Sequence, residues 1–293
     1  MYKIISDSAC DLSPKYVKEH DVIIVPLSVS FDGETYYRDS IDITRSECYQ
    51  RMVDDPKLFP KTSLPSVECY ADTFKEFTDQ GIPVICLTIS LVLSGSYNSA
   101  MMAKELVEEE NPDAQITVID SKQNTVTQAL IIDQIVKMRD AGISFEGMLE
   151  KLDQLMSSAR IFFTVGSLDY LQKGGRIGKV AVAATSKLGV KPIIIMKDGE
   201  IGLGGIGRNR QKLKNNIIQI AKKYINENNK DNFVVSVGYG YDATEGVEFM
   251  NTVEETLETK LNTETNVAIG IVSAVHTGPY AIGIGVIQKF ETL

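Results

Sequence analysis

Short apolar segments alternate with longer amphipathic segments through the first half of the chain. Apolar runs of this length predict buried strands, and the segments between them carry capping residues at one end and a glycine or an asparagine near the other. The predicted strands cover residues 2–6, 22–26, 84–90 and 116–120, and the longer predicted helices cover 66–80, 97–110, 125–141 and 144–158. Crossovers of this length between successive strands indicate a parallel sheet with helices on both faces.

A small hairpin interrupts this alternation. The dipeptide Asp32-Gly33 favours a tight turn and joins residues 27–31 to residues 34–38. Residues 59–65 have no regular pattern, so we expect a loop there, ahead of the helix at 66–80.

The pattern of strands and helices starts again near residue 160. Strands are predicted at 161–165, 191–196, 200–206, 233–237, 267–275 and 281–288, and helices at 209–224 and 243–259, with a short helix up to Gln172 and another that ends at Gly189. The sequence therefore predicts an α/β protein of two layered domains. Residues 1–158 form the first, with a parallel sheet, and residues 159–293 form the second, with a mixed sheet and helices.

Length and composition agree with two globular domains. The 293 residues are about twice a typical domain of roughly 150 residues. No run approaches the ~18 consecutive apolar residues of a membrane span. The first residues lack the basic and apolar regions of a signal peptide. We therefore expect a cytoplasmic protein without integral membrane association.

Cysteine and histidine usage limits the chemistry. The four cysteines form no C-x-x-C pair, which argues against a thiolate metal site or a redox pair. His20 and His276 are the two histidines of the chain, so a site with three histidine ligands is impossible. We expect no metal and no cofactor.

The charge is acidic overall but unevenly distributed. The formal net charge is −9, which disfavours nucleic acid as a partner. Residues 169–223, however, hold 12 basic and three acidic side chains. This basic band is either a solvated face or a docking surface for an acidic protein or a partner that carries phosphate.

Hydroxyl side chains gather in the segments where a parallel sheet binds its ligands. Ligands lie beyond the carboxyl ends of the strands, where we find Ser6-Asp7-Ser8, residues 61–66 and residues 93–97. The last two segments precede helices, whose free N–H groups attract anions. Lys61 is the one cation beside them, so a single carboxylate or phosphate suits these segments better than a polyphosphate. Helix capping is the alternative interpretation for each segment alone.

His276 lies in a predicted turn between two apolar strands. It is followed by Thr277, Gly278 and Pro279, so it is either an ordinary turn residue or a functional one. As a functional residue it would either donate a hydrogen bond to an anion or act as a base.

Residues 202–207 match the pattern G-x-G-x-x-G, which occurs in dinucleotide-binding proteins. That fingerprint requires a strand before the glycines and a helix that begins at them. Here the glycines lie on the second arm of the predicted hairpin around Asp198-Gly199, so they indicate a strand that another backbone or a ligand approaches closely. The chain has no G-x-S-x-G elbow, P-loop or H-E-x-x-H motif.

Five segments in order along almost the whole chain resemble the DegV family of bacterial fatty-acid-binding proteins. They are residues 6–12, 61–66, 93–97, 170–177 and 276–279. The resemblance implies a two-domain α/β fold with a long-chain fatty acid such as palmitate between the domains. It also implies a carrier without its own catalytic nucleophile, which presents the acid to a separate ATP-dependent fatty acid kinase and so feeds exogenous fatty acid into phospholipid synthesis.

The same resemblance assigns roles to individual residues. Thr62 and Ser94 match the family's carboxylate-contacting residues, and His276 matches the histidine near the carboxylate. The supporting residues of the pocket are then Ser63, Gly95, Ser96, Thr277 and Gly278. We expect Arg176 and Arg208, both in the basic band, to lie on the surface that faces the kinase. Tyr280 stands where glycine is common in the family, and we expect its bulk near the pocket for the carboxylate.

Two other functions fit parts of the sequence. A serine hydrolase would use Ser94, His276 and an acid such as Asp7, although no nucleophile elbow supports it. A nucleotide-dependent oxidoreductase would use residues 202–207, whose predicted position on a hairpin argues against that use.

Overall fold

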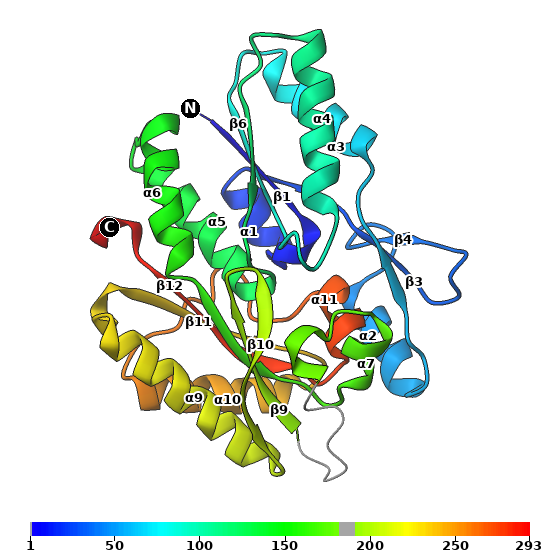
Figure 1. Cartoon of the computed structure of the whole chain (residues 1–293), viewed down its shortest axis with the longest axis vertical. Helices are drawn as coiled ribbons and strands as arrows, with labels where there is room; N and C mark the ends of the chain where they lie inside the picture. Colours follow the sequence, from blue (N-terminus) through cyan, green and yellow to red (C-terminus); the bar gives the residue numbers. More distant parts are fainter. Residues whose placement is uncertain (1, 182–190) are drawn as a thin grey trace.

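A parallel sheet of four strands forms the centre of the first half of the computed structural model, which describes residues 2–181 and 191–293 (Figure 1). Its strand order is β2-β1-β6-β7. The bounds are β1 (Lys3–Asp7), β2 (Val22–Val25), β6 (Val84–Thr88) and β7 (Ile116–Asp120). The two central strands are buried along their whole length, as expected where helices cover both faces. The predicted parallel sheet is confirmed.

Helices cover the two faces of this sheet separately. Side chains of α1 (Pro14–Glu19), α5 (Thr125–Asp140) and α6 (Phe145–Ser157) pack on one face, around Ile4 and Leu87. Side chains of α3 (Val67–Thr78) and α4 (Ser96–Glu110) pack on the other face. Helix α5 also contacts the second sheet of the molecule and is therefore buried on nearly all sides.

A small antiparallel sheet lies beside the first, in the strand order β4-β3-β5. Its strands are β3 (Ser28–Ser30), β4 (Tyr37–Arg38) and β5 (Lys61–Ser63), and α2 (Arg45–Asp54) lies between β4 and β5 in the chain. The predicted hairpin is thus present, but the loop predicted at 59–65 is wrong because β5 pairs with β3 there. Three-residue strands carry too few alternating positions to be seen in a sequence.

The second half is built on five strands in the order β10-β9-β8-β12-β11. Their bounds are β8 (Arg160–Thr164), β9 (Lys191–Lys197), β10 (Glu200–Gly207), β11 (Phe233–Tyr239) and β12 (Ile282–Gln288). All four strand pairs are antiparallel, so the mixed sheet predicted for residues 159–293 is wrong. Helices α9 (Arg210–Glu227) and α10 (Ala243–Leu257) pack on one face. The domain division at residue 158 stays a prediction.

The strand predicted at 267–275 is wrong, because the structure forms α11 (Ile271–Thr277) there. The segment is β-branched and buried on nearly all sides, and periodicity cannot distinguish a short buried helix from a strand in such a run. One isolated bridge between Tyr239 and Ala268 is all the pairing that this segment makes. Helix α11 packs against α7 (Asp169–Lys173), α2 and β3, which brings His276 beside the first half of the chain.

Short 3-10 helices complete the described residues: η1 (Ser8–Cys10), η2 (Gly178–Val180), η3 (Lys230–Asn232) and η4 (Phe290–Thr292). The helix predicted to end at Gly189 lies largely in residues 182–190, outside the described part of the chain. Within the described ranges, none of the helices combines the length and the apolar composition that crossing a membrane requires.

Candidate functional site

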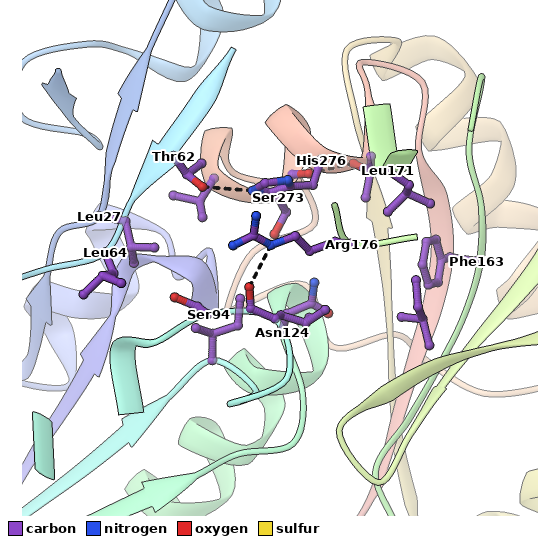
Figure 2. Close-up of a pocket in the computed structure, with 15 residues that line it drawn as sticks. Leu27, Thr62, Leu64, Ser94, Asn124, Phe163, Leu171, Arg176, Ser273 and His276 are labelled. Carbon is purple, nitrogen blue, oxygen red and sulfur yellow. Dashed lines mark hydrogen bonds between the residues drawn. The ribbon is translucent and has the colours of Figure 1, made fainter. Parts of the chain in front are cut away.

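A cavity of about 90 Å³ lies where β5, the loop after β6, α7 and α11 meet the edge of the second sheet (Figure 2). Its lining combines apolar and polar side chains, and Figure 2 shows the polar ones between Leu27 and Leu64 on one side and Leu171 and Phe163 on the other. The apolar lining residues are Leu27, Leu64, Ile89, Leu93, Phe163, Leu171, Ile201 and Val272, and the polar ones are Thr62, Ser94, Asn124, Arg176, Ser273, His276 and Thr277. The structure therefore brings together Thr62, Ser94 and His276, which the sequence placed at one site.

His276 and Thr62 are directly paired. The imidazole Nε2 of His276 lies 2.9 Å from the hydroxyl of Thr62, within hydrogen-bonding distance. His276 is in the last turn of α11 and Thr62 is on β5, which pairs with β3 next to α11. Burial, helped by the positive charge of Arg176, lowers the pKa of His276 to about 4. The imidazole is therefore neutral at pH 7, with one N–H donor and one acceptor nitrogen.

Ser94 lies at the start of α4. Its hydroxyl is 2.9 Å from the hydroxyl of Ser96 and accepts a hydrogen bond from the Ser96 amide at 3.3 Å. Gly95 is the N-cap residue of α4. Because glycine has no side chain that could cap the helix, no N-cap side chain occupies the amides of the first turn, which lie next to Ser94. A side chain at Gly95 would have its Cβ 3.1 Å from Leu64, which shows how closely β5 and the loop after β6 approach here.

Arg176 supplies a positive charge inside the cavity. Its Nε donates to the Leu93 carbonyl at 3.0 Å and its Nη1 donates to the Gly174 carbonyl at 2.6 Å. Figure 2 shows the guanidinium group between His276 and Ser273 on one side and Ser94 and Asn124 on the other. Lys61, the one cation beside the hydroxyl segments in the sequence, is exposed and outside the cavity lining.

The glycines before Arg176 explain its position. Gly175 has a φ of +71°, a conformation that lets the chain turn sharply after α7. At Gly174, a Cβ would lie 2.3 Å from Nδ1 of His276, so only glycine lets α7 end against the imidazole. The sequence signal for this pocket residue was the Gly174-Gly175-Arg176 corner, which we had interpreted as partner surface.

The remaining predicted pocket residues occupy different places. Thr277 lines the cavity, whereas Ser63 is exposed because neighbouring side chains on a strand point to opposite faces. Ser96 is fully buried behind Ser94. Gly278 has a φ of +74° and packs against Tyr170, outside this cavity.

Asn124 and Ser273 are cavity residues that the sequence analysis missed. Asn124 is the N-cap residue of α5, and its side chain makes no capping hydrogen bond. The buried hydroxyl of Ser273 has no hydrogen-bond partner among the described residues. The sequence gives no sign of Ser273, because it lies inside a buried apolar run that predicts a strand and carries no motif of its own.

Tyr280 and Arg208 lie outside the cavity. The ring of Tyr280 packs beside Gly166 and edge-on to Tyr241, and Tyr280 is not among the residues that line the cavity. Arg208 is exposed between β10 and α9, and its role at a partner surface stays a prediction.

An apolar space of about 30 Å³ continues behind the first cavity. The two spaces share Asn124, Phe163, Ser273 and Thr277. The other residues around the second space are Thr125, Val126, Ile161, Gly238, Ile269, Ala281 and Gly283, which are mainly apolar or lack a side chain. The cavity that holds Thr62, Ser94 and His276 thus continues into a mainly apolar space between α5 and the second sheet.

The contacts of a serine hydrolase triad are not assembled. His276 Nε2 faces Thr62, and its buried Nδ1 has no partner among the described residues. The carboxylate of Asp7 instead accepts from the Ile89 amide at 2.8 Å and from the Gln128 amide at 3.1 Å. Residues 202–207 lie on β10, as the sequence indicated, and no helix begins at these glycines. The described residues contain no group of three or more metal-ligating side chains.

Comparison with known proteins places these features in a family. The model of the DegV family, described as uncharacterised proteins, matches residues 1–289. A DegV domain-containing protein of Staphylococcus aureus (strain N315) is 31% identical over 98% of both chains. A fatty acid (stearic acid)-binding protein from Eubacterium ventriosum ATCC 27560 has a crystal structure, and its sequence is 75% identical to this chain over 100% of both chains. The two structures align with a TM-score of 0.98. A DegV family protein from Thermus thermophilus, described by its fatty acid binding, is 26% identical over 98% of this chain and 99% of its own, with a TM-score of 0.86. The chain belongs to the DegV family.

Proposed function

We propose that this protein binds a long-chain fatty acid, with the carboxylate at Thr62, Ser94, His276 and Arg176. The observation that carries the proposal is the lining: one cation and several hydroxyls stand between apolar walls, and the cavity continues past Phe163 into a mainly apolar space. A carboxylate needs hydrogen-bond donors and a positive charge, and an acyl chain needs an apolar path. The stearic acid-binding structure that is 75% identical over the whole chain supports the same ligand class.

The acyl chain would follow the apolar side of the cavity past Phe163, toward the space beside Gly238 and Gly283. About 15 buried methylenes at roughly 0.8 kcal/mol each contribute on the order of 12 kcal/mol of gross transfer free energy. Each hydrogen bond to a charged acceptor contributes about 1.5–3 kcal/mol, and desolvation of the carboxylate offsets much of that. The acyl chain therefore sets the affinity, and the polar residues set the orientation.

The neutral imidazole of His276 suits a binding role for the carboxylate. Since the pKa of His276 is lowered to about 4, the positive charge of the pocket at pH 7 comes from Arg176 alone among its lining residues. Because Nε2 of His276 faces Thr62 and Nδ1 is buried, the tautomer with its proton on Nε2 would donate to the Thr62 oxygen and leave the Thr62 hydroxyl proton for the carboxylate. None of these contacts activates a serine, so the geometry favours a carrier over the hydrolase alternative.

The direct test is native mass spectrometry of the protein purified from cells, followed by denaturation and lipid analysis. We expect one long-chain fatty acid per chain. Delipidated protein should also bind stearic or palmitic acid saturably. Absence of bound lipid together with absence of saturable binding would refute the proposal.

We further propose that the protein is the acyl-binding subunit of an ATP-dependent fatty acid kinase and acts in the cytoplasm. Burying the acyl chain while holding the carboxylate at one position is what a partner needs in order to phosphorylate a poorly soluble acid. The acyl phosphate would then enter phospholipid synthesis. Formation of acyl phosphate from the loaded protein, ATP and a fatty acid kinase tests this step, and its absence with a kinase that is active on another carrier would contradict it.

A further inference from the structure

The path proposed for the acyl chain passes a group of polar side chains before it becomes apolar. The cavities of about 90 Å³ and about 30 Å³ share four lining residues, and three of these, Asn124, Ser273 and Thr277, are polar. Thr125 adds a polar side chain on the second cavity. We call these four residues the polar neck. The other residues around the second cavity are apolar or glycine, so the neck is a feature that an acyl path alone does not require.

Thr125 is the main observation. It is the first residue of α5 and is 8% exposed, and its hydroxyl has no hydrogen-bond partner within the described part of the chain. The Ser273 hydroxyl is enclosed by the protein, whereas the Thr125 hydroxyl stays accessible from the second cavity, which Thr125 lines. Its backbone has a φ of +45°, a conformation that is unusual for a β-branched residue. No internal contact therefore explains a hydroxyl at this position.

Asn124 is a second polar side chain without an internal role. It is the N-cap residue of α5, where an asparagine usually accepts a hydrogen bond from a helix amide. Here it makes no capping hydrogen bond, and it lines both cavities. Figure 2 shows it on the side of the Arg176 guanidinium group away from His276. Its amide can thus donate to and accept from a ligand that passes the neck.

The neck selects for a neutral polar group on the ligand. A plain acyl chain would cover the amide of Asn124 and the hydroxyl of Thr125 with methylene groups, and polar groups buried without partners are costly. None of the residues that line the second cavity carries a charge, so the neck offers no counter-ion for a charged group. A hydroxyl on the acyl chain removes the cost, because it both donates and accepts a hydrogen bond.

We propose that the ligands this site prefers are 3-hydroxy fatty acids, whose hydroxyl is bound by Asn124 and Thr125. The inference rests on the proposed function, since it needs the carboxylate at His276 and Arg176. Ser273, in the neck, lies one helical turn before His276 on α11, and side chains three positions apart on a helix are about 5–6 Å apart. The neck therefore lies beside the first few carbons of the bound acid, which include the third.

The test is a competition for the delipidated full chain. Deuterium-labelled (R)-3-hydroxystearic acid, unlabelled (S)-3-hydroxystearic acid and stearic acid are mixed in equal amounts, and the bound acids are quantified by mass spectrometry. The two enantiomers have the same hydrophobicity, so only contacts with the protein distinguish them. We expect one enantiomer to be bound about tenfold more than the other, because Asn124 and Thr125 reach the path from α5 only. It should also be bound at least as well as stearic acid.

Two variants with matched shapes locate the preference at the neck. Asn124→Leu and Thr125→Val keep the size of each side chain and remove its hydrogen-bonding groups. Each should reduce the ratio of the bound enantiomers toward one and leave stearic acid bound. The matched control is Thr117→Val on β7, a half-buried threonine outside both cavities, which should keep the ratio of the unaltered protein. Asn124→Leu keeps the test valid if Thr125→Val fails to fold, since Asn124 is only partly buried.

The outcomes separate this inference from the function on which it rests. Equal binding of the two enantiomers, an excess of stearic acid over both, or an unchanged ratio in the folded neck variants would each overturn the inference while fatty acid binding stands. A water molecule then satisfies the neck. If none of the three acids binds to the unaltered protein, the proposed function fails and this inference fails with it.

Discussion

His276 and Thr62 are 214 positions apart in the chain, and their side chains lie 2.9 Å apart in the structure. One residue ends a helix of the second half of the chain, and the other is on a three-residue strand of the first half. Any ligand that contacts both is therefore held by the way the two halves pack, and not by a local motif. The position of such a ligand would therefore change if the contact between His276 and Thr62 shifted.

The hydroxyls of Thr62 and Ser94 should control the orientation of the fatty acid more than its affinity. We expect Thr62→Ala and Ser94→Ala to lower the rate of acyl phosphate formation by about 10–100-fold, since each removes a hydrogen bond of about 1.5–3 kcal/mol to a charged acceptor. The affinity of the delipidated protein for stearic acid should fall much less. Thr62→Ser, which keeps the hydroxyl, is the matched control for Thr62→Ala. Equal acyl phosphate formation by the double alanine variant and the unaltered protein would refute the assignment.

His276 should lower the stability of the protein in mild acid. Its pKa is lowered to about 4 in the folded protein, mainly by burial and further by Arg176, whereas the ordinary pKa of a histidine side chain is 6.5. The unfolded chain therefore binds the proton more readily than the folded protein. The contribution of the neutral imidazole to the free energy of unfolding is fully present above pH 6.5 and is lost as the pH falls through 4. An NMR titration should find the imidazole neutral at pH 5.5. Urea unfolding of His276→Gln should show less loss of stability than the unaltered protein between pH 7 and pH 4.5, and identical losses would contradict the prediction.

Asp7 should lower the stability of the protein as the pH rises, which is the opposite of the effect of His276. Burial raises its pKa to about 6, although hydrogen bonds from Ile89 and Gln128 lower it. The folded protein holds this proton more tightly, so the stabilisation is complete below pH 3.8 and is lost as the pH rises through 6. A shift of about two pKa units corresponds to about 3 kcal/mol. Relative to the unaltered protein, Asp7→Asn should therefore gain up to about 3 kcal/mol of unfolding free energy between pH 4 and pH 7.5, measured by urea unfolding. Parallel stability curves for the two proteins would show that Asp7 stays ionised.

The parts of the fold that sequence could predict are those with strong local patterns. The strands of the parallel sheet, the helices that cover it and the β9–β10 hairpin around Asp198-Gly199 all occur in the structure. The structure of residues 267–277 could not be predicted, because a short helix buried on nearly all sides shows no alternation of apolar and polar residues. The strand predicted at 267–275 also placed His276 in a turn, whereas it lies in the last turn of α11.

In the candidate site, too, local sequence patterns indicate some residues and not those that arrive through contacts distant in the chain. Segments 61–66 and 93–97 stand out in the sequence because hydroxyl residues precede helices there, and the resemblance to the DegV family then indicates Thr62 and Ser94 within them. Arg176 reaches the cavity through a hydrogen bond to Leu93, which is 83 positions away, and no local pattern records such a contact. Ser63 was included as the neighbour of Thr62, but on a strand a neighbour points to the opposite face.

Arg208 provides a test of the basic band as a partner surface. It is exposed next to the start of α9 and lies outside the fatty acid cavity. We expect Arg208→Glu to weaken association with the kinase at low salt, with a smaller effect at high salt, and to leave bound fatty acid unchanged. Lys223→Glu, an exposed position in the same band near the other end of α9, is the matched control. If Arg208→Glu and Lys223→Glu both leave association unchanged, the band is a solvated face.

Gly174 offers the sharpest test of the carboxylate site, because it acts on His276 without altering any group that contacts the ligand. In Gly174→Ala the new Cβ would lie 2.3 Å from Nδ1 of His276, so the imidazole must shift away from it. The 2.9 Å contact with Thr62 should then lengthen or break. With stearic acid labelled at the carboxyl carbon, NMR should report a changed carboxylate environment, and acyl phosphate formation should fall.

The matched control is Gly202→Ala on β10, where the nearest atom to a new Cβ is 3.9 Å away and no steric conflict arises. Gly202→Ala should leave the carboxylate signal unchanged. Bound stearic acid should remain in both variants, because the acyl chain supplies most of the affinity. A carboxylate signal in Gly174→Ala that matches the unaltered protein would mean that His276 does not orient the ligand. The carboxylate would then be held by Thr62, Ser94 and Arg176 among the residues assigned to it.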